Sequence, residues 1–98
     1  MNQKFNLDIK DIEIKELDLS NKELGNDILE YLKAIEFKEL KELVLSYNKI
    51  SDIKVLEKVK FEKLFILNLC DNKISDINVL KKVKFKDLRE LYLHNNNI

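Results

Sequence analysis

Residues 37–60 read FKELKELVLSYNKISDIKVLEKVK, and residues 61–84, directly after them, read FEKLFILNLCDNKISDINVLKKVK. The two segments are identical at 15 of 24 positions, mainly at apolar residues, one asparagine and the block NKISDI. A third copy, FKDLRELYLHNNNI, begins at Phe85, and a looser copy, IKELDLSNKEL, occupies residues 14–24. A fixed period of this length predicts a solenoid, in which successive copies stack and share one core.

The composition narrows the classes of partner. The chain has 98 residues, 18 basic and 18 acidic, so no net charge draws it to nucleic acid or to an anionic membrane. No apolar run reaches the roughly 18–20 residues that span a bilayer. The single cysteine excludes an internal disulfide, which favours a reducing compartment, and we expect the cytoplasm.

Each copy opens with apolar residues in alternation, as in Leu43-Val44-Leu45. A period of two predicts a strand with one buried face, so the leucines point inward. An asparagine then follows at a fixed offset, where its amide can satisfy backbone groups at the turn. We interpret these asparagines as a structural ladder through the stack: Asn48, Asn72 and Asn96.

The second half of each copy predicts a short helix or 3-10 turn. Ser51 or Asp52 is a suitable N-cap, and Ile53, Leu56 and Val59 recur every three residues on one face. The phenylalanines at the repeat boundaries are expected to stack in the core: Phe37, Phe61 and Phe85.

The repeated unit, LxxLxLxxNxI with the continuation xxIxxIxxL, resembles the leucine-rich repeat family. The positions that carry the resemblance are Leu40, Leu43, Leu45, Asn48 and Ile50, then Leu64, Leu67, Leu69, Asn72 and Ile74, then Leu88, Leu91, Leu93, Asn96 and Ile98. The short repeat of about 24 residues is most similar to the intracellular and internalin-like types. The resemblance implies an α/β solenoid, a right-handed superhelix with a parallel sheet on the concave face and short helices or 3-10 turns on the convex face.

We expect one domain over residues 1–98. Its expected parts are capping strands at 1–13, an atypical first repeat at 14–39, regular repeats at 40–63 and 64–87, and a truncated last repeat at 88–98. The first repeat is longer and has helical spacing of apolar residues over 26–35, with Asn26 or Asp27 as the expected cap. Terminal repeats are often atypical because they cover an open end.

The last copy predicts an uncovered apolar end at Leu91, Leu93 and Ile98. Two explanations remain open. The chain is a fragment of a longer array, or a second copy covers this end in a homo-oligomer. Both predict that the isolated chain associates with itself.

The resemblance implies that exposed strand residues form the binding surface, so we predict a protein–protein interaction module. This surface is acidic on one edge, and its apolar and aromatic groups are ringed by polar ones, a composition typical of a protein contact. The candidate partner-binding residues for a protein or peptide are Val44, Tyr47, Phe65, Ile66, Asn68, Tyr92 and His94. The alternative function is a structural or assembly segment that stacks through its C-terminal end.

Cys70 and His94 fall on adjacent predicted strands, in one column of residues expected to be exposed, so a thiolate–imidazole pair is geometrically possible. A third orienting group and an enclosed pocket are missing from the pattern, which argues against an enzyme. A metal site would need more ligands than these two and Asp71. We therefore predict neither catalytic nor metal-binding residues, and no cofactor.

Overall fold

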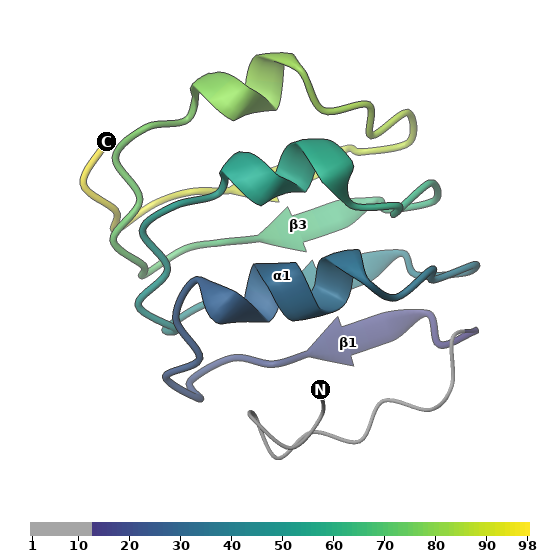
Figure 1. The fold of residues 1–98 in the computed structure, drawn as a ribbon, viewed down its shortest axis with the longest axis horizontal. Helices are drawn as coiled ribbons and strands as arrows, with labels where there is room; N and C mark the ends of the chain where they lie inside the picture. Colours follow the sequence, from purple (N-terminus) through teal and green to yellow (C-terminus); the bar gives the residue numbers. More distant parts are fainter. Residues whose placement is uncertain (1–12) are drawn as a thin grey trace.

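The computed structural model describes residues 13–98 and shows strands alternating with short helical elements (Figure 1). The strands are β1 (Glu16–Asp18), β2 (Glu42–Val44), β3 (Ile66–Asn68) and β4 (Glu90–Tyr92). The helical elements are the α-helix α1 (Asp27–Lys33) and the 3-10 helices η2 (Lys54–Lys58) and η3 (Asn78–Lys81). The predicted capping strands lie outside the described residues.

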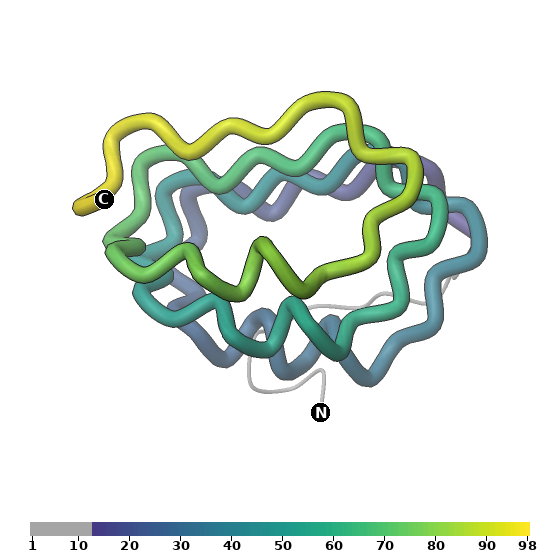
Figure 2. The backbone as a smooth tube through the Cα atoms, turned by 90° about the horizontal axis from the view of Figure 1, so that it is seen from above, coloured from purple at the N-terminus to yellow at the C-terminus, as the bar shows by residue number. Residues whose placement is uncertain are grey.

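The strands form one parallel four-stranded sheet in the order β1-β2-β3-β4. In its register Leu17 pairs with Leu43, Leu43 with Leu67, and Leu67 with Leu91. The sheet forms one layer and the helical elements form the other, and successive turns of the chain lie over one another (Figure 2). This α/β solenoid confirms the predicted fold class.

The core lies between the two layers and is built from the repeated leucines. Leu43, Leu45, Leu67 and Leu69 are fully buried, as their alternation predicts. Each buried leucine contributes about 1.5–3 kcal/mol relative to an exposed one. Leu91 occupies the same register position but is 37% exposed, because β4 is the last strand of the sheet.

The helical layer closes the core from the other side. Ile53 and Leu56 are buried beneath η2. The phenylalanines stack between repeats, with ring centroids 5.8 Å apart for Phe37 and Phe61 and 6.5 Å apart for Phe61 and Phe85. The aromatic column is therefore core, and it extends through the described repeats.

The asparagine side chains fasten each turn to the preceding repeat. Oδ1 of Asn48 accepts hydrogen bonds from the backbone N–H of Lys22 at 3.1 Å and of Leu24 at 3.2 Å. Asn72 serves the repeat of Asn48 in the same way, and Asn96 accepts from the repeat before it. The first repeat has Lys22 at this position, so the ladder starts at Asn48.

Asn26 does not cap α1, which corrects the prediction. Its backbone is helical, with φ −65° and ψ −24°, whereas a capping side chain needs an extended backbone to reach back to the first turn. Its Oδ1 instead accepts from the N–H groups of Ser51 at 2.8 Å and Asp52 at 3.0 Å in the next repeat. Asp27 is the first residue of α1 itself.

The two 3-10 helices begin with an aspartate turn rather than a serine cap. Oδ1 of Asp52 accepts from the N–H of Lys54 at 2.9 Å, and Asp76 does the same for Asn78 at 2.9 Å. An aspartate that binds the N–H two residues ahead forms an Asx turn, which sets the chain direction into the helix. Ser51 is occupied by its contacts to the first repeat instead.

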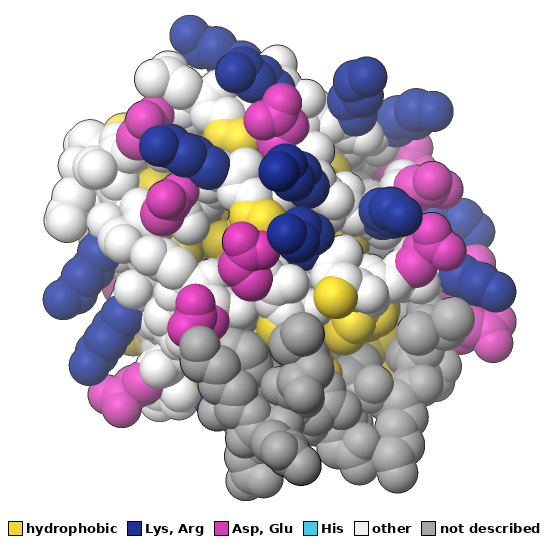
Figure 3. Space-filling view, viewed as in Figure 1, with side chains coloured by type: hydrophobic (Ala, Val, Ile, Leu, Met, Phe, Trp, Pro, Cys, Tyr) yellow, Lys and Arg dark blue, Asp and Glu magenta, His cyan; other side chains and the backbone are white. Residues whose placement is uncertain are grey.

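The helix-side face carries basic and acidic side chains intermixed, with hydrophobic ones scattered between them (Figure 3). Several ion pairs join successive repeats, for example Lys63 with Glu39 at 2.9 Å. Exposed pairs of this kind contribute little to stability. Within residues 13–98, no helix has the length and apolar character needed to cross a membrane.

Candidate functional site

The sheet face that points away from the helical layer is called the concave face here. Because the strands are parallel and in register, its residues form columns, each with one residue from every strand. Ile66 lies between Glu42 and Glu90, and Val44 and Tyr92 flank the residue at 68 in the next column. Adjacent members of a column are about 4.8 Å apart, one strand spacing. Val44, Ile66 and Asn68 are half-buried, so the centre of the face is a shallow mixed surface.

Tyr47 is the most exposed aromatic residue among the described ones, at 57%, and it sits in a left-handed backbone conformation with φ 57°. The equivalent positions of the other repeats, Asn21, Asp71 and Asn95, share this conformation with φ between 56° and 58°. Asparagine and aspartate tolerate it, whereas an aromatic residue there bears about 1–2 kcal/mol of strain. Tyr47 therefore places an exposed aromatic ring at a position where the backbone conformation favours a small polar side chain.

Tyr92 lies on the last strand and is 39% exposed. Its hydroxyl donates a hydrogen bond to the carboxylate of Glu90, which raises the pKa of Tyr92 above its ordinary value. Its ring meets the imidazole of His94 edge to face, with centroids 6.5 Å apart. These three side chains form a connected group at the C-terminal side of the face.

Phe65 precedes β3 and is 42% exposed, whereas Tyr47 follows β2. In a parallel sheet these positions lie at opposite ends of the strands. The structure therefore separates the two aromatic residues and connects them only through the half-buried pair Val44 and Ile66. The candidate surface spans the length of the strands rather than forming one cluster.

Asn68 has a structural role beside its candidate binding role. Its Oδ1 accepts from the N–H of Cys70 at 3.0 Å, as Asp18, in the same register column on β1, accepts from Ser20 at 2.9 Å. The hydroxyl and N–H of Ser20 lower the pKa of the Asp18 carboxyl. Both side chains shape the turn at the end of their strand.

An acidic pocket opens on the concave face at the first two strands. It has a volume of about 230 Å³ and is lined by Glu16, Leu17, Asp18, Glu42 and Val44. Three carboxylates surround an apolar floor, an arrangement that suits the charged head and aliphatic stem of a basic side chain. Val44, which lines the pocket, is also the register neighbour of Asn68 on β3.

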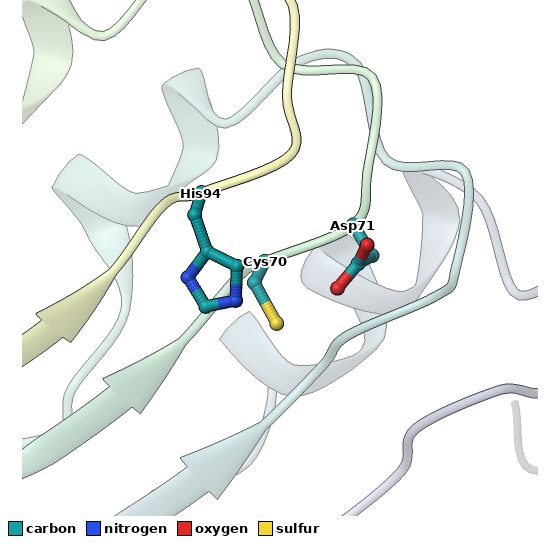
Figure 4. Close-up of side chains that lie close together, drawn as sticks. All are labelled: Cys70, Asp71 and His94. Atoms are coloured by element: carbon teal, nitrogen blue, oxygen red, sulfur yellow. The ribbon is translucent and has the colours of Figure 1, made fainter.

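Cys70, Asp71 and His94 gather in the turns after β3 and β4 (Figure 4). The prediction that the column of Ser20, Ser46, Cys70 and His94 is exposed is wrong for Cys70 and Ser46, which are each only 7% exposed, whereas His94 is exposed. Burial, and after it the Asp71 carboxylate, raises the pKa of the Cys70 thiol. The thiol is therefore protonated at neutral pH and is a poor nucleophile.

Comparison with known proteins agrees with the repeat architecture. The family model for leucine rich repeats (2 copies) matches residues 38–82, the two regular copies. No curated protein matches the chain. Leucine-rich repeats generally mediate protein–protein interaction and are typically not enzymes. With its parallel sheet, short helices and repeated LxxLxLxxNxI unit, the chain is a leucine-rich repeat protein.

Proposed function

We propose that the concave face binds a protein or peptide partner, with Tyr47, Ile66, Asn68 and Tyr92 as central contacts. The observation that carries this proposal is Tyr47, an exposed ring held in a strained backbone conformation. Strain that persists at an exposed residue is typical of functional sites. Tyrosine is also enriched, with tryptophan and arginine, at the energetic centre of protein interfaces.

The charge of the face indicates the chemistry of the partner. Carboxylates of Glu16, Asp18 and Glu42 line the pocket beside Val44, and Glu90 lies beyond Ile66. We infer that the partner presents a lysine or arginine to this pocket and an apolar or aromatic side chain to Ile66. Complementary charge also speeds association and disfavours acidic partners.

The test replaces the centre of the face. Ile66→Glu with Tyr92→Glu places two charges in the contact, and the matched control Ser75→Glu with Asn78→Glu adds the same charge on exposed residues of the helix side. Each protein is immobilised and exposed to an extract of the source cell, and bound proteins are quantified by mass spectrometry. Circular dichroism checks that all variants are folded.

The proposal expects one or more proteins that bind the wild type and the control equally and that the concave-face variant loses at least ten-fold. Partners that bind all three proteins equally place the contact elsewhere and contradict the proposal. Loss of binding by the helix-side control alone would also contradict the proposal.

We propose the cytoplasm as the location of the protein.

A second candidate function is assembly through the C-terminal end. Ile98 is 62% exposed, and Leu91, in the last strand β4, is 37% exposed. A further repeat or a second copy would cover both. Sedimentation velocity of the 98-residue chain tests this, since Leu91→Lys should reduce any concentration-dependent association; an unchanged, fully monomeric wild type contradicts assembly of this chain with itself.

A further inference from the structure

The cluster of Cys70, Asp71 and His94 has the composition of a metal site, and its donor atoms lie near one another. One donor atom from each side chain, a sulfur, a carboxylate oxygen and an imidazole nitrogen, lies within 4.8 Å of the other two (Figure 4). Zinc bonds of about 2.0–2.3 Å in a tetrahedron place ligand atoms about 3.3–3.7 Å apart. Closure of no more than about 1.5 Å, within the reach of side-chain torsions, converts the observed arrangement into a ligand set.

The backbone holds the donors in this arrangement. The N–H of Asp71 donates to the carbonyl of His94 at 3.0 Å, which ties the two turns together. The carbonyl of Cys70 accepts from Nδ2 of Asn72 at 3.1 Å. Nδ2 of Asn95 donates to Oδ1 of Asp71 at 2.9 Å and leaves the other carboxylate oxygen available. Outer hydrogen bonds of this kind orient the ligands of metal sites.

The fold does not require these residue types. The positions equivalent to Cys70 and His94 in the first two repeats are Ser20 and Ser46, and Ser46 is as buried as Cys70. A small hydroxyl therefore satisfies the packing at this turn. The thiol and the imidazole replace it only in the two repeats where they become neighbours, beside a carboxylate.

We propose that Cys70, Asp71 and His94 bind a zinc ion through Sγ, one carboxylate oxygen and one imidazole nitrogen, with water at the fourth position. Thiolate and imidazole are ligands that zinc prefers, and open zinc sites hold three protein ligands and a water. The sequence argued against a metal because a metal site was expected to need more ligands than Cys70, His94 and Asp71. The geometry fits the open type, and the thiol proton passes to solvent when the ion binds.

The competing interpretation is a hydrogen-bonded cluster in which the thiol donates to the Asp71 carboxylate. That network involves Cys70, Asp71 and the Ser46 hydroxyl, and it does not need His94, whose ring meets Tyr92. The zinc site needs Cys70, Asp71 and His94. The role of His94 therefore separates the two interpretations.

The experiment is a Co²⁺ titration of the reduced, untagged chain, followed by displacement with Zn²⁺. The chain contains one cysteine and one histidine, so a thiolate-to-cobalt absorption band in the near ultraviolet has a single possible source. The variants are Cys70→Ser, Asp71→Asn and His94→Gln. Cys70→Ser restores the residue of the second repeat and is expected to fold, which circular dichroism checks.

We expect the wild type to show the band, Zn²⁺ to remove it, and Cys70→Ser to lack it. Asp71→Asn and His94→Gln should each weaken binding at least ten-fold. Asn95→Gly should weaken it about 10- to 100-fold because the Asp71 carboxylate loses its orienting donor. The matched control is Asn21→Gly, the same change in the same left-handed conformation of the first repeat, and it should bind as the wild type does.

A wild type without the band overturns the proposal. Binding by His94→Gln or Asp71→Asn that equals the wild type also overturns it, because the ion would then be held by another set of groups. Loss of binding in the control Asn21→Gly to the same extent as in Asn95→Gly contradicts the assigned role of Asn95.

Discussion

Asn48 donates its backbone N–H to Oδ1 of Asn72 at 3.0 Å, so the side chain of one asparagine in the ladder fixes the backbone of the asparagine before it. The same oxygen accepts from the N–H of Ile50 at 3.0 Å, while Nδ2 donates to the carbonyls of Leu45 and Leu69. Because the turn itself offers no backbone partners for these buried groups, the amide replaces the hydrogen bonds that water would provide. One side chain thus joins two repeats.

Replacing Asn72 by alanine should be strongly destabilising. The substitution removes the acceptor of two buried N–H groups, those of Asn48 and Ile50, and each unsatisfied group costs about 1–3 kcal/mol. We expect the free energy of unfolding to fall by at least about 2 kcal/mol, measured by urea denaturation. Asn96→Ala is the comparison, since Asn96 is half-buried and water can replace part of its contacts, so its loss should be clearly smaller. Equal losses for the two variants would contradict the importance of burial.

Tyr47→Asn should stabilise the fold while weakening partner binding. Asparagine relieves the left-handed strain, so we expect a gain of about 1 kcal/mol in thermal or chemical unfolding. Lys49→Asn is the control, because Lys49 has φ 60° and the same relief there leaves the Tyr47 ring in place. If Tyr47→Asn is more stable and still binds the partner fully, the strain at Tyr47 does not serve partner binding.

Asn26→Ala should weaken the joint between the first two repeats rather than the helix. The variant loses the acceptor for the N–H groups of Ser51 and Asp52, and we expect a destabilisation of about 1 kcal/mol, measured by urea denaturation. Ser51→Ala removes only its hydroxyl contact and keeps both backbone bonds, so it should cost less. Hydrogen exchange that rises in α1 but not at residues 51–52 would instead indicate a capping role.

The Asp18 carboxyl should titrate below its ordinary pKa in the folded chain, and NMR of its side-chain carbon measures this directly. Because folding lowers this pKa, the stability it contributes is present above the pKa of the unfolded chain and is lost as the pH falls through the folded value. Ser20→Ala removes the hydroxyl donor and should move the pKa upward, although the backbone N–H remains. Ser75→Ala, a serine on another repeat, should leave it unchanged.

The repeat pattern predicted most of the fold because its signals are local and periodic. The alternation around Leu43 and Leu67 identified the strands, and the equal spacing set their register. The cap at Asn26 was predicted wrongly, because a residue that precedes a helix has the same composition whether it caps that helix or bonds the next repeat. The left-handed position of Tyr47 was visible in the sequence only as one tyrosine among Asn21, Asp71 and Asn95.

For the candidate site, the sequence predicted which residues form the columns of the concave face, but it did not predict which of these residues are exposed. Cys70 was expected at the surface and is buried, because β3 ends at Asn68 and Cys70 lies in the turn after it. Phe65 and Tyr47 fall in adjacent repeats, yet the structure places them at opposite ends of the strands. Burial and side-chain direction depend on the neighbouring repeats, which no single copy of the pattern contains.

The sequence by itself determined the stacking of this protein, since leucines at a constant spacing bury completely only when identical turns lie one above another. The tertiary structure decided which side chains meet across the repeats: the amide of Asn26 with the second repeat, and the thiol of Cys70 with the carboxylate and imidazole of its neighbours. The reason is that periodicity fixes the position of the backbone, whereas contacts between side chains arise where residues depart from the repeat.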